Sequence, residues 1–273
     1  YRWCRRRRIP FVAYVGTAHS LDSNFKSKVM NALFAAGTLR IYKKNPVLAK
    51  TSAAKEELRQ LGVPHAVIAP VGLDNAVLKK NIPADEKMRL RKEHGFEADD
   101  VILCNVSRLS WEKRPLELID LFLQVKGKKK FKLIIVGNGP LEEELNEKIR
   151  KNGLEKEVKI YPNVPYEKMW EIYEMSDYYL NMNKGEIFGM AIMEAVYYKT
   201  SVAAIRALGP SVTLKDMKGH KLCENDDEMA EWITGPYPSE KDLQESSEKM
   251  AATFTWDRCA DAFLQASSEK SSR

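Results

Sequence analysis

Residues 101–136 decide the fold of this chain, and they read VILCNVSRLSWEKRPLELIDLFLQVKGKKKFKLIIV. Val101–Val106 and Phe131–Val136 are mostly apolar segments of strand length, and Pro115–Val125 between them has helical spacing, with a proline suited to its first turn. A strand, a helix and a second strand in this order predict a right-handed βαβ unit and a parallel sheet. Such sheets bind ligands outside the carboxyl ends of their strands, so we expect the chemistry in the loops that follow the strands.

The same alternation of strands and helices extends to both sides of this segment. Downstream, the pattern predicts strands at Val158–Tyr161, Tyr178–Asn181 and residues 201–204, with helices at residues 141–151, 166–175 and 189–198. Upstream, it predicts strands at residues 11–15, Leu39–Tyr42 and residues 66–69, with helices at residues 24–36 and 50–61. The residues from 75 to 98 are charged, contain a proline and carry little strand signal, which indicates a linker with a short helix at a domain boundary.

The composition is that of a soluble globular protein, with 44% hydrophobic and 30% charged residues in a chain of 273. No apolar run approaches the roughly 20 residues of a membrane-spanning helix, and no signal peptide is visible. The four cysteines form no C-x-x-C pair and no cluster with zinc-ligand spacing. We therefore expect a cytoplasmic protein without a metal site.

Positive charge is concentrated near the start of the chain. Residues 1–75 contain 13 Lys and Arg against 4 Asp and Glu, and Arg5, Arg6, Arg7 and Arg8 are consecutive. One interpretation is a solvated end of the chain, and another is contact with an anionic membrane or an acidic acceptor. Nucleic acid is not expected, because no recognition module accompanies the arginines.

The loop at residues 107–113 follows the first strand of the central segment. It carries Arg108 and Lys113 next to the start of a helix. Because a helix N-terminus already favours anions, cations placed beside it indicate a phosphate clamp rather than compensation of the helix dipole. The alternative is a surface loop with ordinary charges.

The next strand is followed by Gly137, Asn138, Gly139 and Pro140. Glycines let the backbone approach a ligand closely, although a tight turn would use the same residues. The G-x-G-x-x-G pattern of dinucleotide-binding proteins is absent.

The loop and helix at residues 185–195 give the strongest signal. Glu186 lies in the loop, Gly189 opens the helix, and Glu194 lies inside an otherwise apolar helix. A carboxylate in such surroundings is costly unless it has a partner, and a ribose diol could be that partner. The alternative is an ordinary ion pair of Glu194 on a solvated face. The first amides of the helix are suited to a diphosphate.

Taken in this order, the motifs resemble the C-terminal domain of retaining GT-B glycosyltransferases of the family-four type, also called glycosyl transferases group 1. They are Arg108 with Lys113, the glycine turn at residue 137, Val164 with Pro165 and Tyr166, and Glu186 with Glu194 eight residues on. Residues 70–74 resemble the inter-domain segment of that family, residues 11–19 the strand and loop of its active-site histidine, and Thr255-Trp256 the start of its terminal cross-over helix.

The resemblance implies a fold and a division of the chain. The expected fold class is α/β of the GT-B type, with a complete C-terminal Rossmann-like domain and a partial N-terminal one. The expected parts are a partial N-terminal domain on the acceptor side at residues 1–75, a linker at 76–98, a nucleotide-sugar-binding domain at 99–252, and a cross-over helix with a tail at 253–273.

The resemblance also implies a reaction and roles for the site residues. A sugar would pass from a nucleotide diphosphate sugar, the donor substrate, to a glycan or lipid-linked acceptor with retention of its configuration, and no cofactor or metal would be needed. The implied catalytic residues are His19, Arg108, Lys113 and Glu186. The donor would be held by Gly137, Val164, Phe188, Gly189, Met190, Ala191 and Glu194, the last of these on the ribose.

Three features depart from the family pattern. Only about 75 residues precede the linker, where the family has roughly a whole domain. Ile187 stands where the family has a glycine, and residues 206–210 differ from its glycine-rich loop. Two other functions therefore stay open: a truncated, inactive nucleotide-sugar-binding module, and a sugar-nucleotide epimerase of the same architecture. The epimerase is disfavoured because its acid and base carboxylates have no place in these loops.

Overall fold

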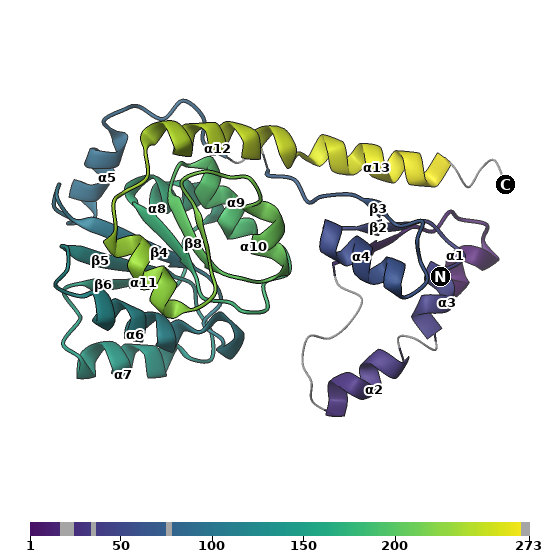
Figure 1. Cartoon of the computed structure of the whole chain (residues 1–273), viewed down its shortest axis with the longest axis horizontal. Helices are drawn as coiled ribbons and strands as arrows, with labels where there is room; N and C mark the ends of the chain where they lie inside the picture. The colour runs from purple at the N-terminus through teal and green to yellow at the C-terminus, as the bar shows by residue number, and fades with distance from the viewer. Residues whose placement is uncertain (17–24, 34–36, 75–77, 269–273) are drawn as a thin grey trace. The chain divides into compact units, whose positions relative to one another are not determined.

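The computed structural model describes residues 1–16, 25–33, 37–74 and 78–268 (Figure 1). The chain divides into two compact units. One unit combines Tyr1–Asp74 with Phe254–Arg273, and the other is Asn75–Thr253. Among the described helices, none has both the length and the apolar character that a bilayer crossing requires.

The larger unit is built on a six-stranded parallel sheet with the strand order β6-β5-β4-β7-β8-β9. The first strand of the unit, β4, therefore lies in the middle, and the chain adds strands first on one side of it and then on the other. The bounds are β4 Val101–Val106, β5 Phe131–Val136, β6 Val158–Tyr161, β7 Tyr178–Asn181, β8 Ser201–Ile205 and β9 Lys221–Cys223.

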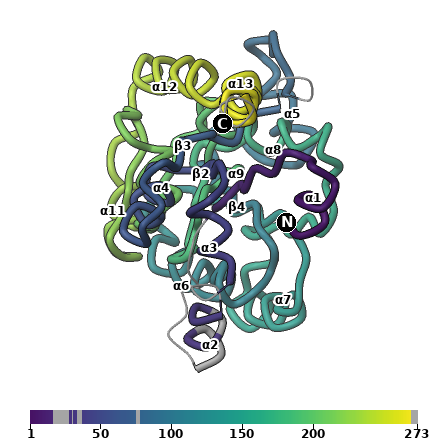
Figure 2. Tube along the Cα trace, turned by 90° about the vertical axis from the view of Figure 1, so that its right-hand side faces the viewer, coloured from purple at the N-terminus to yellow at the C-terminus, as the bar shows by residue number. Residues whose placement is uncertain are grey.

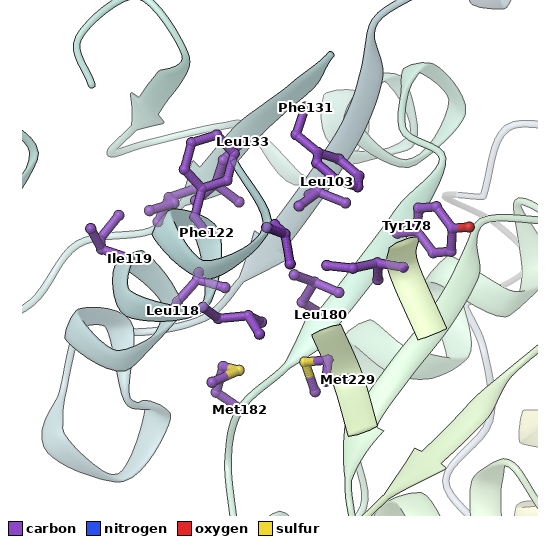
Figure 3. Packing of buried hydrophobic residues seen from close by; sticks show 14 of the residues in the cluster. Leu103, Leu118, Ile119, Phe122, Phe131, Leu133, Tyr178, Leu180, Met182 and Met229 are labelled. Carbon is purple, nitrogen blue, oxygen red and sulfur yellow. The ribbon is translucent and has the colours of Figure 1, made fainter. Parts of the chain in front are cut away.

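Helices cover both faces of this sheet (Figure 1). On one face, Leu103 and Leu180 of the sheet pack with Phe122 of α6 and Met229 of α11 (Figure 3). The helices of the unit are α5 Glu86–Glu93, α6 Pro115–Val125, α7 Glu142–Lys151, α8 Met169–Met175, α9 Met190–Tyr197, α10 Leu208–Thr213, α11 Asp226–Thr234 and α12 Glu240–Thr253, with short 3-10 turns η2 Trp111–Lys113 and η3 Tyr166–Lys168.

The smaller unit has a three-stranded parallel sheet in the order β1-β2-β3. Helix α13 packs on β2 and β3 (Figures 1 and 2). Gly72 is needed there, because a Cβ at this position would lie 2.1 Å from the backbone nitrogen of Trp256. The elements are α1 Arg2–Arg6, β1 Ala13–Val15, α2 Phe25–Leu33, α3 Leu39–Tyr42, β2 Val47–Ala49, α4 Ser52–Gln60, β3 Val67–Ile68 and α13 Trp256–Ser268.

The strand expected at Leu39–Tyr42 is wrong, because these residues form helix α3. Asn45 ends the helix by donating a side-chain hydrogen bond to the carbonyl of Ile41 at 2.7 Å. The strand in this region is Val47–Ala49, whose three residues are all buried. It is too short for the alternation by which a strand is recognised in a sequence.

The segment expected as a linker, residues 76–98, is anchored to the larger unit through α5. Arg91 is 5% exposed. It donates to the carbonyl of Met175 at 2.9 Å and to Oδ2 of Asp177 at 2.6 Å. Lys87 reaches Oδ1 of the same aspartate at 2.9 Å. A single carboxylate just before β7 thus receives two cations from α5.

The glycines after β5 allow two loops of the larger unit to pack together. Gly137 has φ of 137°, and a Cβ there would lie 2.0 Å from the carbonyl oxygen of Ser107. We expect Gly137→Ala to lower the free energy of unfolding by about 3 kcal/mol. The control is Gly153→Ala, where φ is 62° and the space is open, and we expect a loss of about 1 kcal/mol. Equal losses in urea unfolding would show that the contact with Ser107 is unimportant.

Candidate functional site

The strand order places the candidate site. Strands β4 and β7 are neighbours, but their following helices lead away to opposite sides of the sheet, which makes their carboxyl ends a topological switch point. The loops that open there are residues 107–114 after β4 and residues 182–189 after β7. These are two of the three loops in which the sequence predicts the chemistry.

The loop after β4 is fixed by one buried side chain and its backbone bonds. Leu109 is fully buried, its amide donates to the carbonyl of Asn138 at 2.9 Å, and its carbonyl accepts from the amide of Leu141 at 3.0 Å. Arg108, next to this anchor, is exposed and forms no ion pair within the described ranges. Its guanidinium is therefore available to an incoming anion.

Lys113 and Glu186 meet across the switch point. The Nζ atom of Lys113 lies 2.8 Å from Oε2 of Glu186, and the two side chains are 24% and 15% exposed. Asn183 donates to the same oxygen at 3.1 Å. Burial alone would raise the pKa of Glu186, but the hydrogen bonds from Lys113 and Asn183 outweigh it and hold the pKa below its ordinary value. Glu186 is therefore ionised near neutral pH.

The loop after β7 is held against the start of α10. The amide of Gly209 donates to the carbonyl of Glu186 at 2.8 Å, and a Cβ on Gly209 would lie 2.6 Å from the nitrogen of Phe188. Gly189, with φ of 84°, is the N-cap residue directly before α9. Met190 and Ala191 follow in the first turn, where backbone N–H groups have no partner within the helix.

Glu194 is buried on α9, at 7% exposure, and receives two tyrosine hydroxyls. Tyr173 of α8 donates to Oε2 at 2.7 Å, and Tyr166 of η3 donates to Oε1 at 3.2 Å. Burial raises the pKa of Glu194 above its ordinary value, and the two hydroxyl bonds offset this only in part. The partner that the sequence requires for this carboxylate is thus present within the protein, and burial by itself does not call for a ribose.

The remaining predicted residues have these places. Gly137 and Gly139 lie where the loops after β4 and β5 touch. Val164 is half-buried in the segment between β6 and η3, and Phe188 is buried. His19 lies outside the described residues. In the described part of the chain, no three His, Cys, Asp or Glu side chains gather as a candidate metal site.

The sequence predicts no role for three residues of this site: Tyr166, Tyr173 and Asn183. Tyr166 belongs to the Val164-Pro165-Tyr166 motif, which indicates its position but not its bond to Glu194. Asn183 precedes Glu186 by three residues and also accepts from the amide of Gly185 at 2.9 Å, an arrangement typical of a polar turn. No feature of the sequence pairs Tyr173 with Glu194.

Comparisons with known proteins agree with this architecture. Solved structures share the fold: HepE from Anabaena, in complex with UDP and glucose, has a TM-score of 0.77 at 19% identity over 99% of this chain and 74% of that one. Sucrose-phosphate synthase from Thermosynechococcus elongatus has a TM-score of 0.79 at 17% identity over 97% of this chain and 69% of that one. The chain therefore has the GT-B fold.

The family follows from the sequence comparison. The family model described as glycosyl transferases group 1 matches residues 86–250, so the chain belongs to this family. A curated relative is the D-inositol 3-phosphate glycosyltransferase of Mycobacterium avium (strain 104), 26% identical over 93% of this chain. The chain covers 63% of that relative and 60% of a second one of the same name from Mycolicibacterium paratuberculosis.

Proposed function

We propose that this chain is the donor-binding part of a retaining, metal-independent hexosyltransferase. It would move a sugar from a nucleotide diphosphate sugar to a glycan or lipid-linked acceptor in the synthesis of cell-surface polysaccharide or glycolipid. The observation that carries the proposal is the ion pair of Lys113 and Glu186 at the switch point of the sheet.

Charge explains how this pair would act. The leaving nucleoside diphosphate gains negative charge in the transition state, and cations fixed beside it stabilise that charge. Lys113 is held 2.8 Å from Glu186 in the free protein. In our proposal Lys113 turns to the diphosphate, Arg108 adds a second cation, and Glu186 is released to accept hydroxyls of the donor sugar. Because two cations neutralise the diphosphate, a divalent ion is not required.

Binding of the nucleotide would use helix α9. The amides of Met190 and Ala191 at the start of α9 would meet the phosphates, as helix N-termini favour anions. Glu194, one turn further on, would accept the ribose hydroxyls. The complex of HepE with UDP and glucose supports a hexosyl nucleotide as the donor class. The resemblance assigns His19 a catalytic role, which stays a prediction.

The reaction is tested by following the anomeric configuration. UDP-glucose is incubated with the chain and candidate acceptors in EDTA, and the new glycosidic bond is read by proton NMR. An α-linked product from the α-linked donor is expected. A β-linked product, or transfer that requires Mg²⁺ or Mn²⁺, would contradict the proposal. Donor binding without any transfer would favour the alternative of an inactive nucleotide-sugar-binding module.

The smaller unit has a groove lined with arginine that is suited to an anionic surface. A groove of about 890 Å³ between α1 and α3 is lined by Arg2, Arg5, Arg6 and Arg40 among its charged residues. Among the described residues that line it, none carries a carboxylate. Trp3, on α1, is 58% exposed, and tryptophan is enriched at membrane surfaces. We propose that this region contacts an anionic membrane surface and keeps the protein at the cytoplasmic face.

We expect the chain to bind vesicles that contain phosphatidylglycerol better than neutral phosphatidylcholine vesicles. Each basic residue near such a surface contributes about 1 kcal/mol, so replacing both Arg5 and Arg6 with Glu should weaken binding by more than about tenfold. The matched control replaces the exposed Lys128 and Lys156 with Glu and should bind almost as the unmodified chain. Co-sedimentation with vesicles measures binding of the unmodified chain and of the two variants. If the unmodified chain binds neutral vesicles as well as anionic ones, the membrane contact is contradicted.

A further inference from the structure

The two tyrosine bonds to Glu194 differ in kind. Tyr173 is 1% exposed, and its hydroxyl lies 2.7 Å from Oε2. Tyr166 is 42% exposed, and its hydroxyl lies 3.2 Å from Oε1. The first bond is short and enclosed in the core of the unit. The second is longer, and it comes from a side chain that already borders solvent.

The two tyrosines also differ in how freely they can move. Tyr173 lies on α8 and stacks on Tyr198 with ring centroids 5.8 Å apart, so it is held by packing. Tyr166 is the first residue of the three-residue turn η3, directly after Pro165. Rotation about its side-chain bonds would move its hydroxyl away from the carboxylate without disturbing a strand or a long helix.

Little space remains beside Glu194 while Tyr166 is in place. The cavity that borders Glu194, Tyr166 and Tyr173 has a volume of about 10 Å³. That is about the space that one water molecule needs. A ribose hydroxyl that is to reach Oε1 through this cavity therefore has to take the position of the Tyr166 hydroxyl.

We propose that Tyr166 competes with the ribose for Oε1 of Glu194 and leaves this oxygen when the nucleotide binds. The inference rests on the proposed function, because it assumes that Glu194 binds the ribose. Tyr173 keeps its bond to Oε2 and holds the carboxylate in place during the exchange. Tyr166 is thus a residue that sets nucleotide affinity, and the bond it makes in the free protein lowers that affinity.

The test is a binding cycle with two ligands. Calorimetric titration of the full chain with UDP and with 2′,3′-dideoxy-UDP is compared between the unmodified protein and Tyr166→Phe. The variant no longer has to break a hydrogen bond to a charged group, so its dissociation constant for UDP should fall about fivefold. The dideoxy ligand has no hydroxyl for Oε1, so its affinity should not change.

A second variant separates competition from structural support. Tyr173→Phe removes the enclosed bond to Oε2 and should not tighten UDP binding, and thermal unfolding checks that both variants fold. Unchanged or weaker UDP binding by folded Tyr166→Phe would overturn the competition while leaving the nucleotide site standing. An equal gain for both ligands would overturn it as well. If neither the unmodified protein nor Tyr166→Phe binds any nucleotide, the proposed function fails and this inference fails with it.

Discussion

Replacement of Lys113 with Ala is expected to weaken UDP binding by roughly 2–3 kcal/mol, a factor of about 30 to 150, because a charge-assisted bond to the diphosphate is lost. The change also leaves Glu186 half-buried without its cation, and this carboxylate would then repel the phosphates. Uridine carries no phosphate, so its binding should change little. Calorimetric titration of UDP and of uridine into the unmodified chain and into Lys113→Ala compares the affinities.

The matched control for Lys113 is Lys148→Ala. Lys148 is exposed to nearly the same degree, 26% against 24%, and it also pairs with a carboxylate, at 2.6 Å from Asp120. It lies on α7, and its Nζ atom donates to the carbonyl of Leu116 on α6 at 2.9 Å, so these bonds involve neither residues 107–114 nor residues 182–189. If both variants lose UDP affinity equally, or if Lys113→Ala weakens uridine as much as UDP, the role of Lys113 is structural.

Glu194→Gln is expected to weaken UDP and uridine binding by the same amount, roughly 1–3 kcal/mol, because the lost charge faces the ribose that both ligands share. Glutamine keeps the size of the side chain, and its amide can still bond to the hydroxyls of Tyr173 and Tyr166. The variant should therefore fold. Titration of the two ligands into the folded variant is the measurement.

Glu174→Gln is the control for Glu194. Glu174 lies on α8, and burial raises its pKa as it does for Glu194. Its surroundings are a groove lined by Lys79, Lys80 and Lys199, away from the loops of the candidate site. UDP affinity should be unchanged in this variant. A folded Glu194→Gln protein with normal affinity for both ligands would remove Glu194 from the nucleotide site.

The middle of the chain was predictable because its signals are long and consistent. The expected bounds of β4, α6, β5, β6 and β7 are those of the structure, since the strands are rich in apolar and aromatic residues and α6 has apolar residues at helical spacing. The shortest strands were harder to predict. Strand β9 has three residues and β2 has three, and no alternation can be recognised in so short a run.

The candidate site was predictable as a position but not as a set of contacts. Parallel topology brings the loops after β4 and β7 to one edge, which is enough to place Lys113 near Glu186. The sequence also required a partner for Glu194. The sequence could not identify Tyr173, 21 residues away, as that partner, because the pairing of Tyr173 with Glu194 depends on how α8 and α9 pack on the sheet.

The central claim is that a nucleoside diphosphate binds at the switch point of β4 and β7 without a metal. The measurement is calorimetric titration of the chain with UDP, GDP and ADP in the presence of EDTA. We expect at least one of the three to bind at a single site with a dissociation constant of about 1 mM or lower, which is about −4 kcal/mol of binding free energy. The folded chain binding none of them, or binding only after Mg²⁺ or Mn²⁺ is added, would contradict the claim.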